Sequence, residues 1–197
     1  QSLWAGVDRL MADPSVPTEV PLARMVDPAM NAAMTQTALW ATLALHRGFF
    51  QYQDQQRQGV WQPHAQRQAR EVPVLVLGLG LLGTQVAQAL SSLGYPVTAW
   101  RLHAGRPTPQ GVQAVQGMTA LQHALGHSQV VINLLPLTVH TRGLINADFL
   151  ARLPAGAGLV NLARGAHVVD ADLLQALDAG HLAHAVLDVF ATEPLPL

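Results

Sequence analysis

The sequence predicts an α/β fold with a doubly wound parallel sheet, on two observations. From residue 72 onward, short continuous apolar runs alternate with helical stretches, as expected for strands buried on both faces and the helices that connect them. A glycine-rich turn, GLGLLG at residues 78–83, follows the first of these runs and opens a helical stretch. The 197 residues are enough for one sizeable core, or for one domain and part of another.

The alternation gives an expected order of elements. The first strand falls at residues 72–77 and the first helix at residues 81–93. Further strands are expected at residues 97–100, 130–134, 158–162 and 183–189, and further helices at residues 119–125, 146–152 and 171–179. Such units form parallel sheets with right-handed crossovers.

The N-terminal third has a different pattern. Residues 1–26 carry two short apolar pieces, 3–7 and 20–25, on either side of a proline-containing stretch, and are expected to be the remnant of a small βαβ unit. Residues 27–58 predict one long helix beginning at Asp27-Pro28, a good cap and first-turn pair. Its apolar content implies that much of its surface is covered, either within this domain or by a second subunit.

Composition excludes several classes of function. The formal net charge is −1 and no basic cluster occurs, which argues against a nucleic-acid partner. The chain has no cysteine, and its eleven basic residues are all arginine, which removes disulfides, thiolate zinc sites, P-loop phosphate binding and Schiff-base chemistry. We expect no metal site. No apolar run reaches the roughly 20 residues that cross a bilayer, and no signal peptide is visible, so a cytoplasmic protein is expected.

Each glycine of the turn has a physical task in dinucleotide binding of the Rossmann type. Gly78 makes the tight turn, Gly80 lets the backbone approach a pyrophosphate, and Gly83 allows the helix to pack closely on the strand. The helix amino terminus that follows favours an anion.

The end of the second expected strand distinguishes between the two nicotinamide cofactors. A site for NAD needs an acidic residue about 20 residues after the turn, to bind the ribose 2′-hydroxyl. Arg101 stands there, with His103 and Arg106 close behind. A guanidinium attracts a 2′-phosphate, so the sequence predicts a preference for NADP(H), with NAD(H) possible; the alternative is that Arg101 is a solvated loop arginine.

Charged residues follow two later strands. Arg164 comes just after the strand at 158–162, and Asp188 and Glu193 come at and after the end of the last strand. Ligands bind at the carboxyl ends of the strands in open parallel sheets. The sequence therefore predicts that two carboxylates and an arginine converge on one rim.

Four local patterns resemble the D-isomer-specific 2-hydroxyacid dehydrogenases: GLGLLG, NLLPLTVHTRGLIN (133–146), NLARGAHVVDADLLQAL (161–177) and LDVFATEP (187–194). Within that family the chain is most similar to the glyoxylate/hydroxypyruvate reductases. The resemblance implies a dinucleotide-binding domain at residues 27–191 with a helical dimerisation arm at 27–72. It also implies that residues 1–26 are the remnant of a smaller flavodoxin-like substrate domain and that residues 192–197 begin the return to it.

The resemblance also implies roles for site residues. Arg164 would bind the 2-oxo acid and polarise its carbonyl, and Glu193 would raise the pKa of a proton-donating histidine. Ala5 and Gly6 would hold the substrate carboxylate through backbone amides. Residues expected beside the cofactor are Leu81, Leu82, Leu135, Pro136, Leu162, Ala163 and Asp188.

The family's proton-donating histidine lies in a segment beyond Leu197, so this chain is expected to be a fragment that binds the cofactor. All nine histidines are expected to be structural or solvated. The predicted function is reduction of a small 2-oxo acid, glyoxylate or hydroxypyruvate, with NADPH, by a homodimer. The alternatives are another D-2-hydroxyacid dehydrogenase using NADH, or a non-catalytic module that senses NAD(P). Families that rely on a catalytic lysine are excluded because the chain has none.

Overall fold

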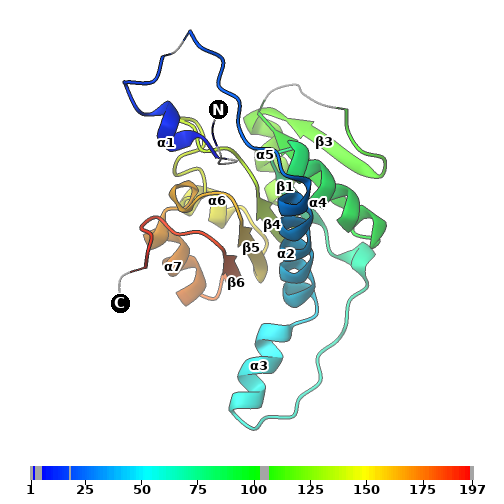
Figure 1. Cartoon of the computed structure of the whole chain (residues 1–197). Helices are drawn as coiled ribbons and strands as arrows, with labels where there is room; N and C mark the ends of the chain where they lie inside the picture. Colours follow the sequence, from blue (N-terminus) through cyan, green and yellow to red (C-terminus); the bar gives the residue numbers. More distant parts are fainter. Residues whose placement is uncertain (1, 3–5, 18, 103–106, 196–197) are drawn as a thin grey trace.

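The computed structural model describes residues 2, 6–17, 19–102 and 107–195. Its centre is one parallel sheet of six strands in the order β3-β2-β1-β4-β5-β6 (Figure 1). The strands are β1 (Val74–Leu77), β2 (Val97–Arg101), β3 (Val112–Gln116), β4 (Val130–Asn133), β5 (Ala157–Asn161) and β6 (Leu182–Leu187). The predicted doubly wound Rossmann-type sheet is confirmed. The strand order reverses between β1 and β4, which is where open α/β sheets bind ligands.

The register brings the carboxyl ends of the central strands to one level. Leu77 of β1 is opposite Trp100 of β2 and Asn133 of β4, and Asn133 is in turn opposite Asn161 of β5. Asn161 is opposite Leu187, the last residue of β6. The loops that leave these strands therefore begin side by side along one edge, which we call the carboxyl edge of the sheet.

Helices cover both faces of the sheet. On one face, α2 (Pro28–His46) and α4 (Leu81–Ser92) bury Ala38, Ala41, Val86 and Leu90 against a set of strand residues that includes Val74, Val76, Ala99, Ile132 and Val160. On the other face, α5 (Gly117–Leu125), α6 (Ala147–Ala151) and α7 (Asp170–Asp178) bury their apolar side chains against Leu75, Leu77, Val131 and Leu159. Because both faces are covered, every residue of β1, β4 and β5 is buried. This explains the continuous apolar runs in the sequence.

The predicted strands and helices of the sheet domain form within a few residues of their expected bounds, and one strand was missed. The missed strand, β3, has the sequence VQAVQ and lies at the edge of the sheet, where its residues are half-buried or exposed. An edge strand of this kind lacks the continuous apolar run on which the prediction depended.

The prediction of one long helix at residues 27–58 is wrong. The structure has two helices there, α2 and α3 (Phe49–Arg57), which Figure 1 shows pointing in different directions. They are separated at Gly48, whose φ of +67° lies in the left-handed region that ends a helix. The predicted start is correct, because Pro28 is the first helical residue and the Asp27 carboxylate accepts a hydrogen bond from Ala29 N–H at 2.9 Å.

The apolar piece at 20–25, predicted as part of a βαβ remnant, is irregular and forms no strand. The regular element in the described part of residues 1–26 is α1 (Asp8–Met11). Residues 3–5 of the other apolar piece lie outside the described residues, so the remnant as a whole stays a prediction. Ser2 N–H donates to the Ala23 carbonyl at 2.7 Å. None of the helices in the described ranges is both long and apolar enough to cross a membrane.

Candidate active site at the carboxyl edge of the sheet

The turn after β1 lies tightly against the loop after β4. Gly78 has a φ of +100°, a conformation that side chains of L-residues rarely adopt. Its N–H donates to the Trp100 carbonyl at 2.8 Å, and a Cβ added to it would stand 3.0 Å from the Leu134 carbonyl oxygen. Gly83 is equally constrained, because a Cβ there would overlap the carbonyl oxygen of Gly78. Gly78 is thus required by its backbone conformation and by the loop after β4, and Gly83 by the close approach of α4 to the turn.

Gly80 differs from its two neighbours in the motif. It is the N-cap of α4, it is exposed, and a Cβ added to it would meet nothing within 4 Å. No side chain caps this helix, and its first turn carries no acidic residue. The first N–H groups of an uncapped helix are unsatisfied and favour an anion. The open space in front of Gly80 therefore fits a pyrophosphate, with Leu81 and Leu82 forming the first turn behind it.

Arg101 is the last residue of β2, in register with Gln116 of β3, and is half-buried. The preceding residue, Trp100, is fully buried, and its indole Nε1–H donates to the Gly117 carbonyl at 2.8 Å. This bond ties the end of β2 to the start of α5. Arg101 thus emerges from a fixed strand end next to the glycine turn, while His103 and Arg106 lie outside the described residues.

A pair of buried asparagines organises the next two loops. Asn133 and Asn161 end β4 and β5, are fully buried, and are joined by a bond from Asn133 Nδ2 to Asn161 Oδ1 of 3.0 Å. Asn133 Oδ1 accepts from Leu135 N–H at 3.2 Å. Asn161 Oδ1 accepts from Ala163 N–H at 3.2 Å, and its Nδ2 donates to the Arg164 carbonyl at 3.1 Å. The predicted cofactor-side residues Leu135 and Ala163 are therefore held by one amide pair.

Arg164 is held in place from two sides. Its Nε donates to Asp8 Oδ1 at 3.1 Å and its Nη1 donates to the Ala163 carbonyl at 2.8 Å. Gly6 lies directly against the guanidinium, because a Cβ on Gly6 would overlap Arg164 Nη2. Two residues predicted to bind substrate, Gly6 and Arg164, are thus brought together from opposite ends of the chain. The third, Ala5, lies outside the described residues.

The segment after β6 lies against the turn that carries Arg164. A Cβ on Gly165 would overlap the backbone of Phe190, so the two segments are in contact. Asp188 N–H donates to the Asn161 carbonyl at 3.1 Å. The exposed Glu193 accepts a bond from Phe190 N–H at 2.9 Å through Oε1. The segments that carry these residues thus meet at one rim, and the convergence of the two carboxylates on Arg164 stays a prediction. The ion pair that Arg164 makes in the described structure is with Asp8.

His167 completes this edge of the sheet. It belongs to the short 3-10 helix η2 (Gly165–His167) and is fully buried. Its Nδ1 lies 3.1 Å from the Arg164 carbonyl oxygen, and its Nε2 lies 3.3 Å from the Pro136 carbonyl oxygen. Burial is the main cause that lowers the pKa of His167, which makes the ring neutral at pH 7.

The chain can now be compared with known proteins. The model of the family described as "D-isomer specific 2-hydroxyacid dehydrogenase, NAD binding domain" matches residues 39–197. The chain belongs to the D-isomer specific 2-hydroxyacid dehydrogenase family. Among its relatives, the glyoxylate/hydroxypyruvate reductase A of Salmonella heidelberg (strain SL476) is 40% identical over 200 residues, which cover 99% of this chain and 64% of that protein. The chain thus spans 64% of the length of the relative.

Two solved structures of the same family are similar over nearly the whole chain. A D-isomer specific 2-hydroxyacid dehydrogenase from Xanthobacter autotrophicus Py2, in complex with NADPH and MES, has a TM-score of 0.93 and 42% identity, covering 98% of this chain and 78% of that one. An NADPH-dependent glyoxylate/hydroxypyruvate reductase from Sinorhizobium meliloti, in complex with NADP and sulfate, has a TM-score of 0.90 and 34% identity, covering 98% of this chain and 61% of that one.

The sequence did not predict three residues that position the loops and Arg164 at the carboxyl edge. Asn133 and Asn161 were detectable as polar residues at the ends of two apolar runs, but their pairing depends on strand register. Asp8 carried no signal of its own, because its partner Arg164 is 156 residues away in the chain.

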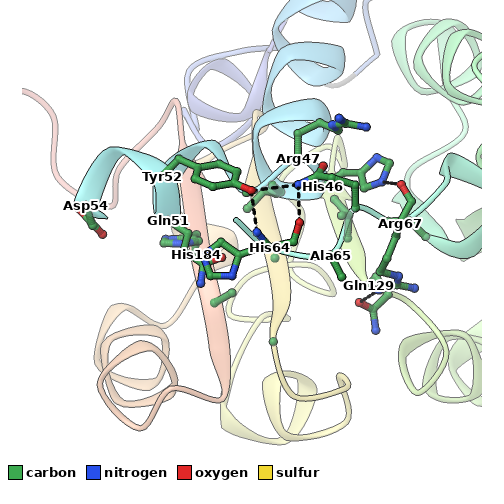
Figure 2. A pocket seen from close by; sticks show the side chains of 18 of the residues that line it. His46, Arg47, Gln51, Tyr52, Asp54, His64, Ala65, Arg67, Gln129 and His184 are labelled. Atoms are coloured by element: carbon green, nitrogen blue, oxygen red, sulfur yellow. Dashed lines mark hydrogen bonds between the residues drawn. The ribbon is translucent and has the colours of Figure 1, made fainter. Parts of the chain in front are cut away.

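A cavity of about 570 Å³ lies at the opposite end of the sheet and is separate from this edge. It is lined by α3, by the segment around His64 to Arg67, and by residues at the amino ends of the strands, such as Gln129 and His184. Figure 2 shows Tyr52 and His64 facing this hollow, where His64 N–H donates to the Tyr52 hydroxyl at 3.1 Å. Arg67 Nη1 donates to Gln129 Oε1 at 2.7 Å and ties the segment to the sheet (Figure 2). The glycine turn lies at the carboxyl ends of the strands and the cavity at their amino ends, so the cavity is not the cofactor site.

Proposed function

We propose that the protein reduces a small 2-oxo acid, glyoxylate or hydroxypyruvate, to the corresponding 2-hydroxy acid, with NADPH as hydride donor. The observation that carries this proposal is the placement of Arg164 beside Gly6 at the edge of the sheet that also bears the glycine turn. A guanidinium next to a nucleotide site suits a planar, anionic substrate. The reductase names of the Salmonella and Sinorhizobium relatives support the same substrate class.

The cofactor would lie along the carboxyl edge. Its pyrophosphate would bind the α4 amino terminus at Gly80, Leu81 and Leu82, and Arg101 would bind the 2′-phosphate. Leu135, Pro136, Leu162 and Ala163 would flank it, with Asp188 near the nicotinamide carboxamide. The NADPH and NADP in the two solved relatives support the preference for the phosphorylated cofactor. When bound, NADPH supplies the hydride.

Arg164 would bind the substrate through Nη2. Asp8 and the Ala163 carbonyl engage Nε and Nη1, and Nη2 lies beside Gly6. The negative charge that develops on the carbonyl oxygen during reduction would be stabilised by this fixed cation, which needs little reorganisation. Backbone amides near Gly6 would hold the substrate carboxylate.

Completion of the reaction requires one proton on the substrate oxygen. In the family resemblance this proton comes from a histidine in a segment that follows Glu193, and Glu193 would hydrogen-bond that histidine and raise its pKa. Glu193 lies in the segment that contacts the Arg164 turn, so it is on the correct side of the sheet for this role.

We further propose that the helical arm makes a homodimer in the cytoplasm. Exposed aromatic side chains gather on the arm: Trp40 is 53% exposed, Phe49 55% and Trp61 98%. Apolar exposure on this scale is typical of a protein–protein interface. In this proposal residues 1–26 and 192–197 belong to the substrate domain, and residues 27–191 form the cofactor domain with its arm at 27–72.

The direct test is to follow NADPH oxidation by the purified protein with glyoxylate and with hydroxypyruvate, with NADH in parallel. We expect turnover with NADPH and loss of at least about a hundredfold in kcat/KM for Arg164→Lys, because lysine cannot reproduce the bidentate geometry. Arg142→Lys, at an exposed arginine, is the matched control and should leave kcat/KM unchanged. Faster turnover with NADH would favour the NADH-dependent alternative, and tight NADPH binding without turnover on any 2-oxo acid would favour a sensing module.

A further inference from the structure

The loop after β4 and the loop after β5 are joined by the asparagine pair and by backbone bonds such as that from Gly143 N–H to the Ala166 carbonyl at 2.9 Å. A further buried side chain, His167, also lies between them. The ring lies between two carbonyl oxygens that belong to different loops, Pro136 after β4 and Arg164 after β5. No part of the side chain reaches solvent, since its exposed fraction is 0%. The hydrogen-bond partners of the imidazole are therefore these two backbone groups.

The hydrogen bonds that the two carbonyl oxygens already accept indicate which of them accepts a hydrogen bond from the imidazole ring. A carbonyl oxygen has two lone pairs. The Arg164 oxygen accepts from Asn161 Nδ2 at 3.1 Å and from the backbone N–H of His167 itself at 3.2 Å. The Pro136 oxygen accepts from the Thr141 hydroxyl at 2.8 Å. Among the described residues a lone pair therefore remains on the Pro136 carbonyl oxygen, whereas both lone pairs of the Arg164 carbonyl oxygen are engaged.

A neutral imidazole carries one N–H, on either Nδ1 or Nε2. An N–H on Nδ1 would donate within the η2 turn and would add no bond to the loop after β4. An N–H on Nε2 would donate to Pro136 and join the two loops. The free lone pair on Pro136 favours the second arrangement.

We propose that His167, as the Nε2–H tautomer, is a positioning residue that joins the Pro136 loop to the Arg164 turn, so that the cofactor-side loop and the substrate-binding arginine are held as one unit. This inference rests on the proposed function for its kinetic consequence. The hydrogen bond itself does not depend on that function. His167 touches neither substrate nor cofactor in this account and acts only through the two loops.

The proposal predicts a specific kinetic defect. His167→Phe fills a similar space without ring nitrogens, so the Pro136 carbonyl would lose the bond from the ring while the Asn161 bond to Arg164 remains. We expect kcat/KM for the 2-oxo acid to fall about tenfold, as one hydrogen bond is worth, and the Kd for NADPH to rise. His167→Gln, whose amide can donate to Pro136, should recover most of the loss.

His181 offers a matched control. Its Nε2 lies 3.0 Å from the Leu150 carbonyl, so it too binds a backbone oxygen, but away from both loops. His181→Phe and His181→Gln should lower the thermal stability to a similar extent without changing kcat/KM or the Kd for NADPH. Equal kinetic effects of His167→Phe and His181→Phe would overturn the positioning role.

A spectroscopic measurement tests the bond without any turnover. Long-range ¹H–¹⁵N correlation spectra of the protein at pH 7, with the His167 signals assigned by their loss in His167→Gln, distinguish the two tautomers. We expect the Nε2–H form, and the Nδ1–H form would overturn the proposal. If the wild-type protein reduced no 2-oxo acid, the proposed function would fail, while the tautomer and the NADPH affinities would still decide this inference.

Discussion

Asp8 and Arg164 form an ion pair, with 3.1 Å between Asp8 Oδ1 and Arg164 Nε, although 156 residues separate them in the chain. The Asp8 side chain is 21% exposed and that of Arg164 is 41% exposed, so the pair is neither fully solvated nor buried. Asp8 is the first residue of α1, and Arg164 follows β5. The substrate-binding arginine of the proposed reductase is therefore oriented by a residue of the N-terminal segment.

Removal of this carboxylate tests whether the orientation matters. Asp8→Ala frees Arg164 Nε, and we expect a loss of stability of at most about 1 kcal/mol, because the pair is partly screened by solvent. The KM for the 2-oxo acid should rise at least about fivefold, since a mobile guanidinium loses pre-organisation. Steady-state kinetics and urea unfolding measure the two effects. Asp54→Ala, which breaks the exposed Asp54–Arg57 pair, should change neither; an unaltered KM in Asp8→Ala would contradict the assigned role.

The asparagine pair predicts strongly coupled effects on stability. Asn133→Ala leaves the buried Leu135 N–H without its partner and removes one of the two donors to Asn161 Oδ1, which keeps Ala163 N–H. An unsatisfied buried group costs about 1–3 kcal/mol and a lost hydrogen bond about 1 kcal/mol, so either single variant should lower the unfolding free energy by about 2–4 kcal/mol. The double variant Asn133→Ala/Asn161→Ala should cost clearly less than the sum, because both single changes break the same bond. Additive values in urea unfolding would show that the two side chains act independently.

Two glycines of the turn, Gly80 and Gly83, predict separable effects on cofactor affinity and stability. Gly83→Ala would overlap the Gly78 carbonyl and should destabilise the fold by more than about 2 kcal/mol. Gly80→Ala meets open space and should leave the thermal midpoint nearly unchanged, yet it should weaken NADPH binding at least about tenfold by blocking the pyrophosphate.

Gly126→Ala is the control for these glycine variants. A Cβ on Gly126 meets only ordinary contacts of 3.7 and 3.9 Å, and the residue caps α5. It should change neither the thermal midpoint nor the NADPH affinity to a comparable extent. If Gly80→Ala bound NADPH as tightly as the wild type, the pyrophosphate would not lie at this turn.

Arg101 should discriminate between the two nicotinamide cofactors. Arg101→Ala removes the guanidinium proposed to bind the 2′-phosphate, and hydrogen bonds to charged groups are worth about 1.5–3 kcal/mol. The Kd for NADPH should therefore rise about 10- to 100-fold, while the Kd for NADH stays within about twofold. Fluorescence titration with both cofactors measures the ratio, and Arg142→Ala serves as the control. An equal loss of affinity for NADPH and for NADH would mean that Arg101 supports the end of β2 and does not bind the 2′-phosphate.

The buried histidine predicts how stability depends on pH. Burial lowers the pKa of His167 in the folded protein below its ordinary value of about 6.5. The unfolded chain therefore binds a proton more readily than the folded one, and this contribution to stability is present above pH 6.5 and is lost as the pH falls through the folded pKa. Between pH 7.5 and about 5, the wild type should lose more unfolding free energy than His167→Gln. Identical pH slopes for the two proteins would contradict a neutral, buried His167.

The sequence determined most of the sheet and less of the site. Strands such as β4 and β5 are buried on both faces, so each appears in the sequence as a continuous apolar run. The edge strand β3 has no such run, and a single glycine, Gly48, breaks a helix in a segment that otherwise reads as continuous. A lone glycine is tolerated inside helices, and only its left-handed conformation ends one.

The contacts of the site that the sequence did not predict depend on long-range geometry. The residues after the strands were predictable because parallel strands bring their carboxyl ends to one edge. The partners of those residues were not, because Asp8 meets Arg164, and Asn133 meets Asn161, only once tertiary packing and register are set. The role of His167 depends on counting the acceptors of two carbonyls, which no sequence pattern encodes.

If the carboxyl edge of this sheet binds a nicotinamide dinucleotide, the folded protein should bind NADPH in the absence of any 2-oxo acid. Calorimetric titration with NADPH measures this, since it requires neither a substrate nor a proton donor. We expect saturable binding at one site per chain. A folded protein that gave no binding isotherm with NADPH or NADH would show that this edge is not a dinucleotide site.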